Sequence, residues 1–138
     1  MDMKKKTTLS KLFFLLASVD GSIKPKEEAI GDAMCSVEGI EPPTFAEMVK
    51  GLTAENRTLI LSKAITELKS MSRADQVRCI AWMCMIANAD GFMEKAEWQL
   101  IYKIYHKELN LSLEEILNEQ RNLGKASRPY LMAVSCAA

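Results

Sequence analysis

Apolar residues recur every three or four positions along most of the chain, which is the spacing of one buried face of an α-helix. The pattern predicts a first helix from Ser10, its N-cap, to the turn at Asp20-Gly21. Pro25 and the pair Pro42-Pro43 predict the starts of the second and third helices, because proline suits the first helical turn. No stretch alternates strictly between polar and apolar residues, so the predicted fold class is all-α.

The second half of the chain continues this pattern. Thr53 is expected to cap a fourth helix over residues 54–70, and Ser112 to cap a seventh in a capping box with Glu115. A fifth helix, predicted from Arg73 to about Ala89, is apolar over much of its circumference, which predicts that it is central and the most buried. A sixth helix follows, so the prediction is a single domain of about seven helices.

The ends of the chain lack this periodicity. Residues 1–9 are predicted to form a flexible N-terminal tail and residues 124–138 an extended C-terminal tail, so the folded domain covers 10–123.

The same loop-to-helix motif, Asp-Gly-x-apolar-x-x-x-Glu, occurs twice. It runs from Asp20 to Glu27 and from Asp90 to Glu97, with an offset of 70 positions. The surrounding residues align without a gap, which predicts an internal repeat of helices 1–3 (about 11–51) and helices 5–7 (73–122) about a pseudo-twofold axis. The fourth helix would link the two units.

The motif has two physical interpretations. Gly21 and Gly91 supply the positive φ that a sharp turn needs, the apolar residue Ile23 or Met93 is expected to pin the loop to the core, and the glutamate can cap the following helix. Alternatively, the carboxylates bind a divalent cation, since the motif matches the second half of a calcium-binding loop. The first half lacks ligands, because Leu16 or Ile86 stands where the leading aspartate belongs, and helix capping is therefore the favoured interpretation.

The candidate cation ligands are carboxylates in or beside the two loops. Lys24 and Lys26 lie beside the first loop, whereas Glu94 adds a third carboxylate to the second, which makes the second loop the better candidate. The full set is Asp20, Glu27, Asp90, Glu94 and Glu97.

The two motifs, Ala17 to Ile23 with Glu27 and Ala87 to Met93 with Glu97, resemble those of the TerB family of tellurite-resistance proteins and of the related N-terminal domains of DjlA-type cochaperones. The resemblance covers roughly Leu12 to Asn122. It implies an all-helical fold in a cytoplasmic bacterial protein, linked in some members to tellurite resistance and to envelope or phage stress. It also implies an interaction or metal-sensing module with no catalytic mechanism.

Charge and hydropathy narrow the classes of partner. The 18 basic and 18 acidic residues balance, which argues against nucleic acid or an anionic membrane surface as the partner. No apolar stretch reaches the roughly 20 residues that span a bilayer. Lys4 to Lys6 before Leu12 to Ala17 superficially resembles a secretory signal, but the apolar stretch runs directly into the first Asp-Gly motif, so a cytoplasmic location is expected.

The remaining reactive residues suggest no enzyme. The four cysteines contain no Cys-x-x-Cys pair, and His106, the single histidine, has no recognisable nucleophile motif near it. Trp98, Tyr102 and Tyr105 share one stripe of the sixth helix, which is either an interaction surface or part of the core. The sequence thus predicts a non-enzymatic module that binds a protein partner or senses stress, with a homodimer expected. The alternative is a weak divalent-cation binder.

Overall fold

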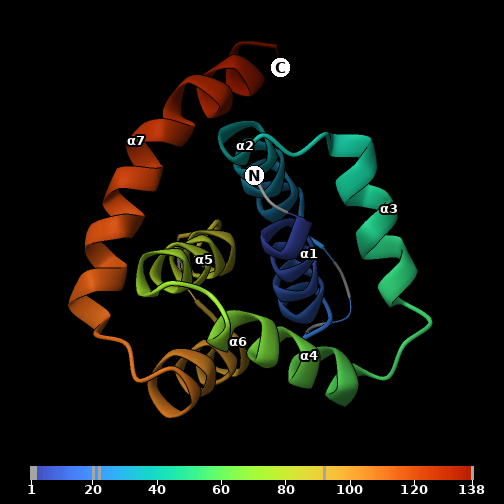
Figure 1. Ribbon diagram of the computed structural model, residues 1–138. Helices are drawn as coiled ribbons and strands as arrows, with labels where there is room; N and C mark the ends of the chain where they lie inside the picture. The colour runs from blue at the N-terminus through green and yellow to red at the C-terminus, as the bar shows by residue number, and fades with distance from the viewer. Residues whose placement is uncertain (1–2, 20, 22, 92, 138) are drawn as a thin grey trace.

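Helices α1 (Met3–Ala17) and α5 (Arg73–Ala87) pack against each other at the centre of the molecule, and the other helices surround them (Figure 1). The computed structural model describes residues 3–19, 21, 23–91 and 93–137, with the backbone alone at 133–137. The surrounding elements are α2 (Pro25–Glu38), α3 (Pro42–Leu52), α4 (Arg57–Lys69), α6 (Lys95–Tyr102), the π-helical segment η1 (Lys103–Glu108) and α7 (Leu113–Ala137). No strand occurs in this part of the chain, which confirms the all-α prediction.

The central position of α5 follows from its sequence. Every side chain from Cys79 to Cys84 is buried, and six consecutive residues point in all directions around a helix. The prediction that this helix is the most enclosed is confirmed. In α1 the buried residues Leu12, Leu15 and Leu16 face the same core. Fully burying a leucine contributes about 1.5–3 kcal/mol, so these two helices supply much of the hydrophobic stabilisation.

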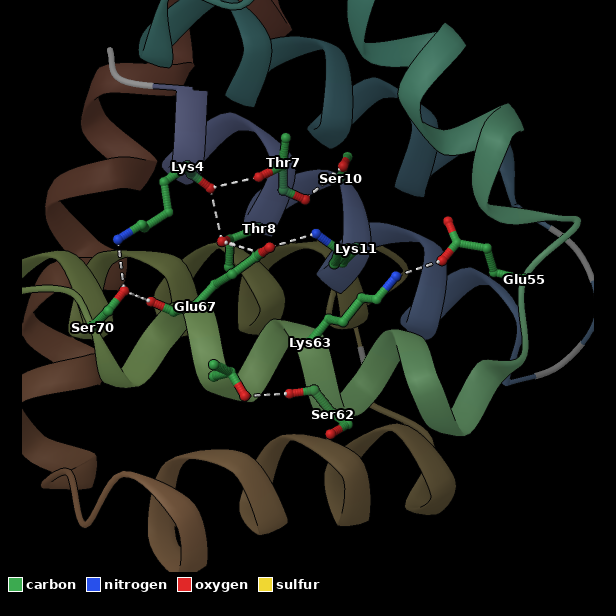
Figure 2. Close-up of polar contacts among 11 residues, drawn as sticks. Lys4, Thr7, Thr8, Ser10, Lys11, Glu55, Ser62, Lys63, Glu67 and Ser70 are labelled. Carbon is green, nitrogen blue, oxygen red and sulfur yellow. Dashed lines mark hydrogen bonds and ion pairs between the residues drawn. The ribbon is translucent and has the colours of Figure 1, made fainter.

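The outer helices divide between the two central ones. Helices α3 and α4 pack on α1, whereas α7 packs along α5 and α2. A polar seam holds α4 to α1, as Figure 2 shows: the Thr8 hydroxyl donates to Oε1 of Glu67 (2.7 Å), and the Lys11 ammonium donates to Oε2 of the same carboxylate (2.7 Å).

The predicted N-terminal tail is wrong. Helix α1 begins at Met3, and Thr8 and Leu9 are 0% and 2% exposed. Ser10 is no N-cap, because it lies inside the helix, where its hydroxyl donates to the carbonyl of Thr7 (2.7 Å). The first turns of this helix are rich in lysine, so the spacing of apolar residues does not predict them. Lysine packs here through ion pairs with acids on neighbouring helices, as Lys5 does with Asp75 (3.2 Å).

The predicted C-terminal tail is also wrong, because α7 continues to Ala137 with Pro129 inside it. Leu123 and Ser127, one turn apart, are 1% and 0% exposed, so the helix stays buried against the protein beyond the predicted end of the domain. Tertiary burial of this kind outweighs the loss of one helical hydrogen bond at the proline.

Most predicted helix starts and stops are confirmed. Helix α2 begins at Pro25, as predicted, and ends at Glu38, where the C-cap Gly39 has a φ of 72° and its amide donates to the carbonyl of Cys35. The predicted cap Thr53 is wrong: Asn56 caps α4, its side chain accepting from the amides of Thr58 and Leu59. None of the described helices has the length and apolar content to cross a bilayer.

The element bounds repeat with the offset seen in the sequence. Residues 3–17 of α1 and 73–87 of α5 are 70 positions apart, and so are α2 (25–38) and the combined α6 and η1 (95–108). The third pair differs, since α3 has 11 residues and α7 has 25. A twofold relation between the two whole units stays a prediction.

Candidate functional site

Both Asp-Gly turns use glycine in the left-handed region. Gly21 has a φ of 84° and Gly91 a φ of 93°, conformations that cost a residue with a Cβ about 1–2 kcal/mol. The helices that follow begin alike: the amide of Glu28 donates to the carbonyl of Lys24 (3.0 Å), and the amide of Trp98 donates to that of Glu94 (2.9 Å). The predicted role of the two glycines as turn residues is confirmed.

The motif glutamates point into the protein at these helix starts. Oε1 of Glu27 accepts a hydrogen bond from the backbone amide of Lys24 (2.9 Å), the residue that precedes α2. Glu27 is only 5% exposed and Glu97 only 3%. In the first loop, therefore, the predicted glutamate serves as a helix cap, which satisfies an amide that the helix leaves without an internal partner.

The apolar residues of the two loops behave differently. Met93 is half-buried and packs against the core, as predicted. Ile23 is 41% exposed, so the prediction that it pins the first loop to the core is wrong. Its side chain instead lines a hollow between α2 and α3.

The carboxylates of the second loop face a lysine from the first. The Lys24 ammonium lies 2.9 Å from Oε1 of Glu94 and 3.9 Å from Oδ2 of Asp90. All three side chains are about one-third exposed, so water screens the pair and its net contribution is at most about 1 kcal/mol. A divalent cation bound to Asp90 and Glu94 would therefore lie beside the positive charge of Lys24.

The full predicted ligand set is not assembled among the described residues. Asp20 lies outside them, Glu27 caps a helix, and Glu94 pairs with Lys24. Within the ranges that the structure describes, no group of three or more His, Cys, Asp or Glu side chains is arranged to hold a metal ion.

The aromatic stripe forms one cluster at the junction of α6 and η1. Trp98, Tyr102 and Tyr105 have ring centroids 5.6–6.1 Å apart, and the His106 ring stacks on Tyr102 at 4.7 Å. Tyr105 is buried, whereas Trp98 is 37% exposed. The stripe is thus part core and part surface: Tyr105 belongs to the core, as one alternative predicted, and the role of the exposed part as an interaction surface stays a prediction.

The π-helical segment contributes to this cluster. The amide of Leu109 donates to the carbonyl of Ile104, five residues back (3.0 Å). In this segment Tyr105 is buried and the next residue, His106, is exposed. π-Helical turns are rare and are often found at functional sites, so this segment is a candidate functional element. The sequence analysis predicted an ordinary helix here.

A family model, "Tellurite resistance protein TerB", matches residues 6–118 of the 138-residue chain. The chain belongs to the TerB family. Comparisons with curated proteins and with solved structures found no match. The matched range begins inside α1 and ends in the first turns of α7, so it includes both Asp-Gly loops and the aromatic cluster.

The thiols described in this TerB-family protein are poor nucleophiles. Burial raises the pKa of Cys35 and Cys79 to about 12 and that of Cys84 to about 11. Because the thiolate is the reactive form, these three cysteines stay protonated and unreactive near neutral pH. Cys136 lies where the side chains are not described.

One buried charged cluster in the TerB-family domain was not singled out from the sequence. Glu38, whose side chain is 5% exposed, accepts hydrogen bonds from Arg78 and from Nε1 of Trp82 (2.7 Å), and Arg78 also contacts Glu119. These residues join α2, α5 and α7. Two signals pointed to the cluster: an acid before the helix-ending Gly39, where the helix dipole disfavours it, and an arginine one turn from a tryptophan on an otherwise apolar helix.

Proposed function

We propose that this TerB-family protein is a non-enzymatic interaction module whose partner-binding surface is the aromatic cluster of α6 and η1. The observation that carries the proposal is Trp98, a tryptophan 37% exposed and in ring contact with Tyr102 and Tyr105. Tryptophan and tyrosine are enriched among the residues that dominate binding energy, and a ring held by its neighbours loses little conformational freedom on binding.

The cluster also has the mixed character of an interface. Tyr105 anchors it in the core, while Tyr102 and His106 present a stacked pair with polar atoms at the rim. A bound protein would cover the apolar rings and still find hydrogen-bonding groups at their edges. We place the module in the cytoplasm and link it to stress responses such as tellurite exposure, in keeping with the name of the family.

The test compares two exposed apolar side chains. Partners are captured from the native cell with and without tellurite, identified by mass spectrometry, and measured against purified protein for the wild type, Trp98→Ala and Leu59→Ala. Leu59 lies on α4 and is 49% exposed, so it matches the loss of an exposed apolar side chain at another site.

We expect Trp98→Ala to weaken binding of the purified partner by roughly 30-fold, as a residue worth about 2 kcal/mol does, and Leu59→Ala to leave it unchanged. Equal affinity for the wild type and Trp98→Ala would show that the cluster is not the binding surface. The alternative of a weak divalent-cation binder stays a prediction and is tested through Lys24 below.

A further inference from the structure

A second surface, distinct from the aromatic cluster, is an apolar groove between α2 and α3. Its volume is about 320 Å³, within the usual range of ligand pockets. Phe13 of α1 and Gly31 of α2 line its base, where a Cβ on residue 31 would come within 2.7 Å of the Phe13 ring. The walls are formed by Ile23, Glu28, Asp32, Pro42, Phe45, Ala46, Val49 and Lys50.

The apolar residues of the α3 wall share one face of that helix. On α3 the lining residues Pro42, Phe45, Ala46 and Val49 stand at helical spacing, which places them in one stripe along that helix. Helix α3 lies at the edge of the molecule and packs on α1 and α2 (Figure 1). An apolar stripe at this spacing is the kind of surface that receives an amphipathic helix, whose apolar residues recur at the same spacing.

The charges on the walls differ. Glu28 and Asp32 stand one turn apart on α2, and among the described residues neither forms an ion pair. Burial and the neighbouring Glu28 raise the pKa of Asp32, and a positive charge placed beside this carboxylate would favour its ionised form. On the opposite wall, Lys50 of α3 is the basic residue.

We propose that this groove binds a basic amphipathic helix of a protein partner, with a large apolar side chain seated between Phe45, Val49 and Ile23. A lysine or arginine of the bound helix, one turn from the apolar anchor, pairs with Glu28 and Asp32. Charge complementarity selects this occupant, because an acidic helix would add to the repulsion on the α2 wall.

The experiment uses the full chain and two synthetic peptides of about 15 residues, close to the length at which isolated helices become stable in water. Both peptides carry leucine at positions spaced three and four apart, and one carries lysine and the other glutamate at the remaining positions. Binding is followed by amide chemical shifts and by calorimetry. We expect the lysine peptide to bind with shifts concentrated at Ile23, Phe45 and Val49, and the glutamate peptide to bind at least tenfold more weakly.

Four variants separate the groove from general attraction. Combining Glu28→Gln with Asp32→Asn is expected to weaken the binding of the lysine peptide by roughly tenfold, which corresponds to the loss of two ion pairs of modest strength. Val49→Asp removes the apolar seat, and Lys50→Gln leaves affinity unchanged or increases it. Glu114→Gln removes one exposed carboxylate on α7, outside the groove, and as the control for each single loss of charge it is expected to have no effect. Circular dichroism verifies that each variant is folded.

The proposal is overturned if the lysine peptide does not bind at millimolar concentration, if the glutamate peptide binds equally well, or if the double variant and Glu114→Gln behave alike. Trp98→Ala serves to keep the two surfaces apart. It is expected to lose the partner of the aromatic cluster and to retain the lysine peptide, so that failure at one surface leaves the other to be judged by its own measurement.

Discussion

The two Asp-Gly loops share the geometry of their turns and differ in charge at the residue that precedes the following helix. Both glycines have a positive φ, and both motif glutamates are buried. The residue before α2 is Lys24, whereas the residue before α6 is Glu94, and these two side chains meet at 2.9 Å. Equivalent positions of the two loops thus carry opposite charges and contact each other.

A second contact shows the same relation. Lys5 near the start of α1 and Asp75 near the start of α5 are also 70 positions apart, and they pair at 3.2 Å. The two ion pairs lie at opposite ends of the central helices. The difference between the loops therefore teaches that opposite charges allow corresponding ends of similar elements to approach, and that the carboxylates of the second loop neutralise a lysine.

The largest expected effect comes from the buried glutamates. Glu27→Ala leaves the amide of Lys24 without its acceptor inside a closed turn, and we expect a loss of about 1–3 kcal/mol in the free energy of unfolding. Glu97→Ala is expected to cost a similar amount if the two loops are equivalent. Urea unfolding followed by circular dichroism measures both.

Two controls sharpen this comparison. Glu28→Ala removes an exposed carboxylate from the turn that holds Glu27, and a change within about 0.5 kcal/mol is expected there. Glu27→Gln retains an oxygen acceptor and should recover much of the loss. If Glu27→Ala lowers the free energy of unfolding and Glu97→Ala does not, the start of α6 is stabilised by other contacts.

The turn glycines give the next effect. Gly21→Ala and Gly91→Ala meet open space within 4 Å of the added Cβ, so only backbone strain opposes them, at about 1–2 kcal/mol each. Gly51→Ala in α3 and Gly124→Ala in α7 meet the same open space on helical backbone and should stabilise by up to about 1 kcal/mol. Thermal unfolding of the four variants gives the sign directly, and stabilisation by Gly21→Ala would contradict the role of the turn.

The turns and helix starts of the loops could be predicted from the sequence because their signals are local. A glycine after an aspartate, a proline at a helix start and a glutamate in the first turn each act through neighbouring backbone atoms, and Gly21, Pro25 and Glu27 lie where these rules place them. The predictions for the two ends of the chain were wrong because the structure there depends on contacts that are not local. The helix at Thr8 and Leu9 and the helix at Ser127 depend on burial against distant elements, which periodicity does not report.

Contacts between distant residues were the other part that the sequence could not supply. The pairing of Lys24 with Glu94 and that of Glu38 with Trp82 join residues 70 and 44 positions apart, so no local pattern contains them. Lys24 was read as a feature of the first loop alone. Its long side chain reaches the second loop, which changes the interpretation of Asp90 and Glu94 as free cation ligands.

The ion pair between the loops is expected to have a smaller effect. Lys24→Glu places a like charge beside Asp90 and Glu94, and we expect a loss below about 1 kcal/mol because all three groups are partly exposed. Adding Glu94→Lys restores the opposite charges and most of the stability. A double-mutant cycle at low salt measures the coupling, which should fall at high salt, and a coupling that is indifferent to salt would contradict an electrostatic contact.

The smallest expected effect tests whether the second loop can hold a cation once its lysine is removed. Lys24→Met frees Asp90 and Glu94, two carboxylates in a partly exposed loop, which suits at best a millimolar calcium site. Calcium at its dissociation constant would add about 0.4 kcal/mol to the stability of this variant. The wild type should show no shift at Gly91 in the same titration, because the lysine competes for both carboxylates. Calcium binding of equal strength in the wild type would mean that Lys24 does not occupy the cation position, and the divalent-cation interpretation of the loop would then be the better one.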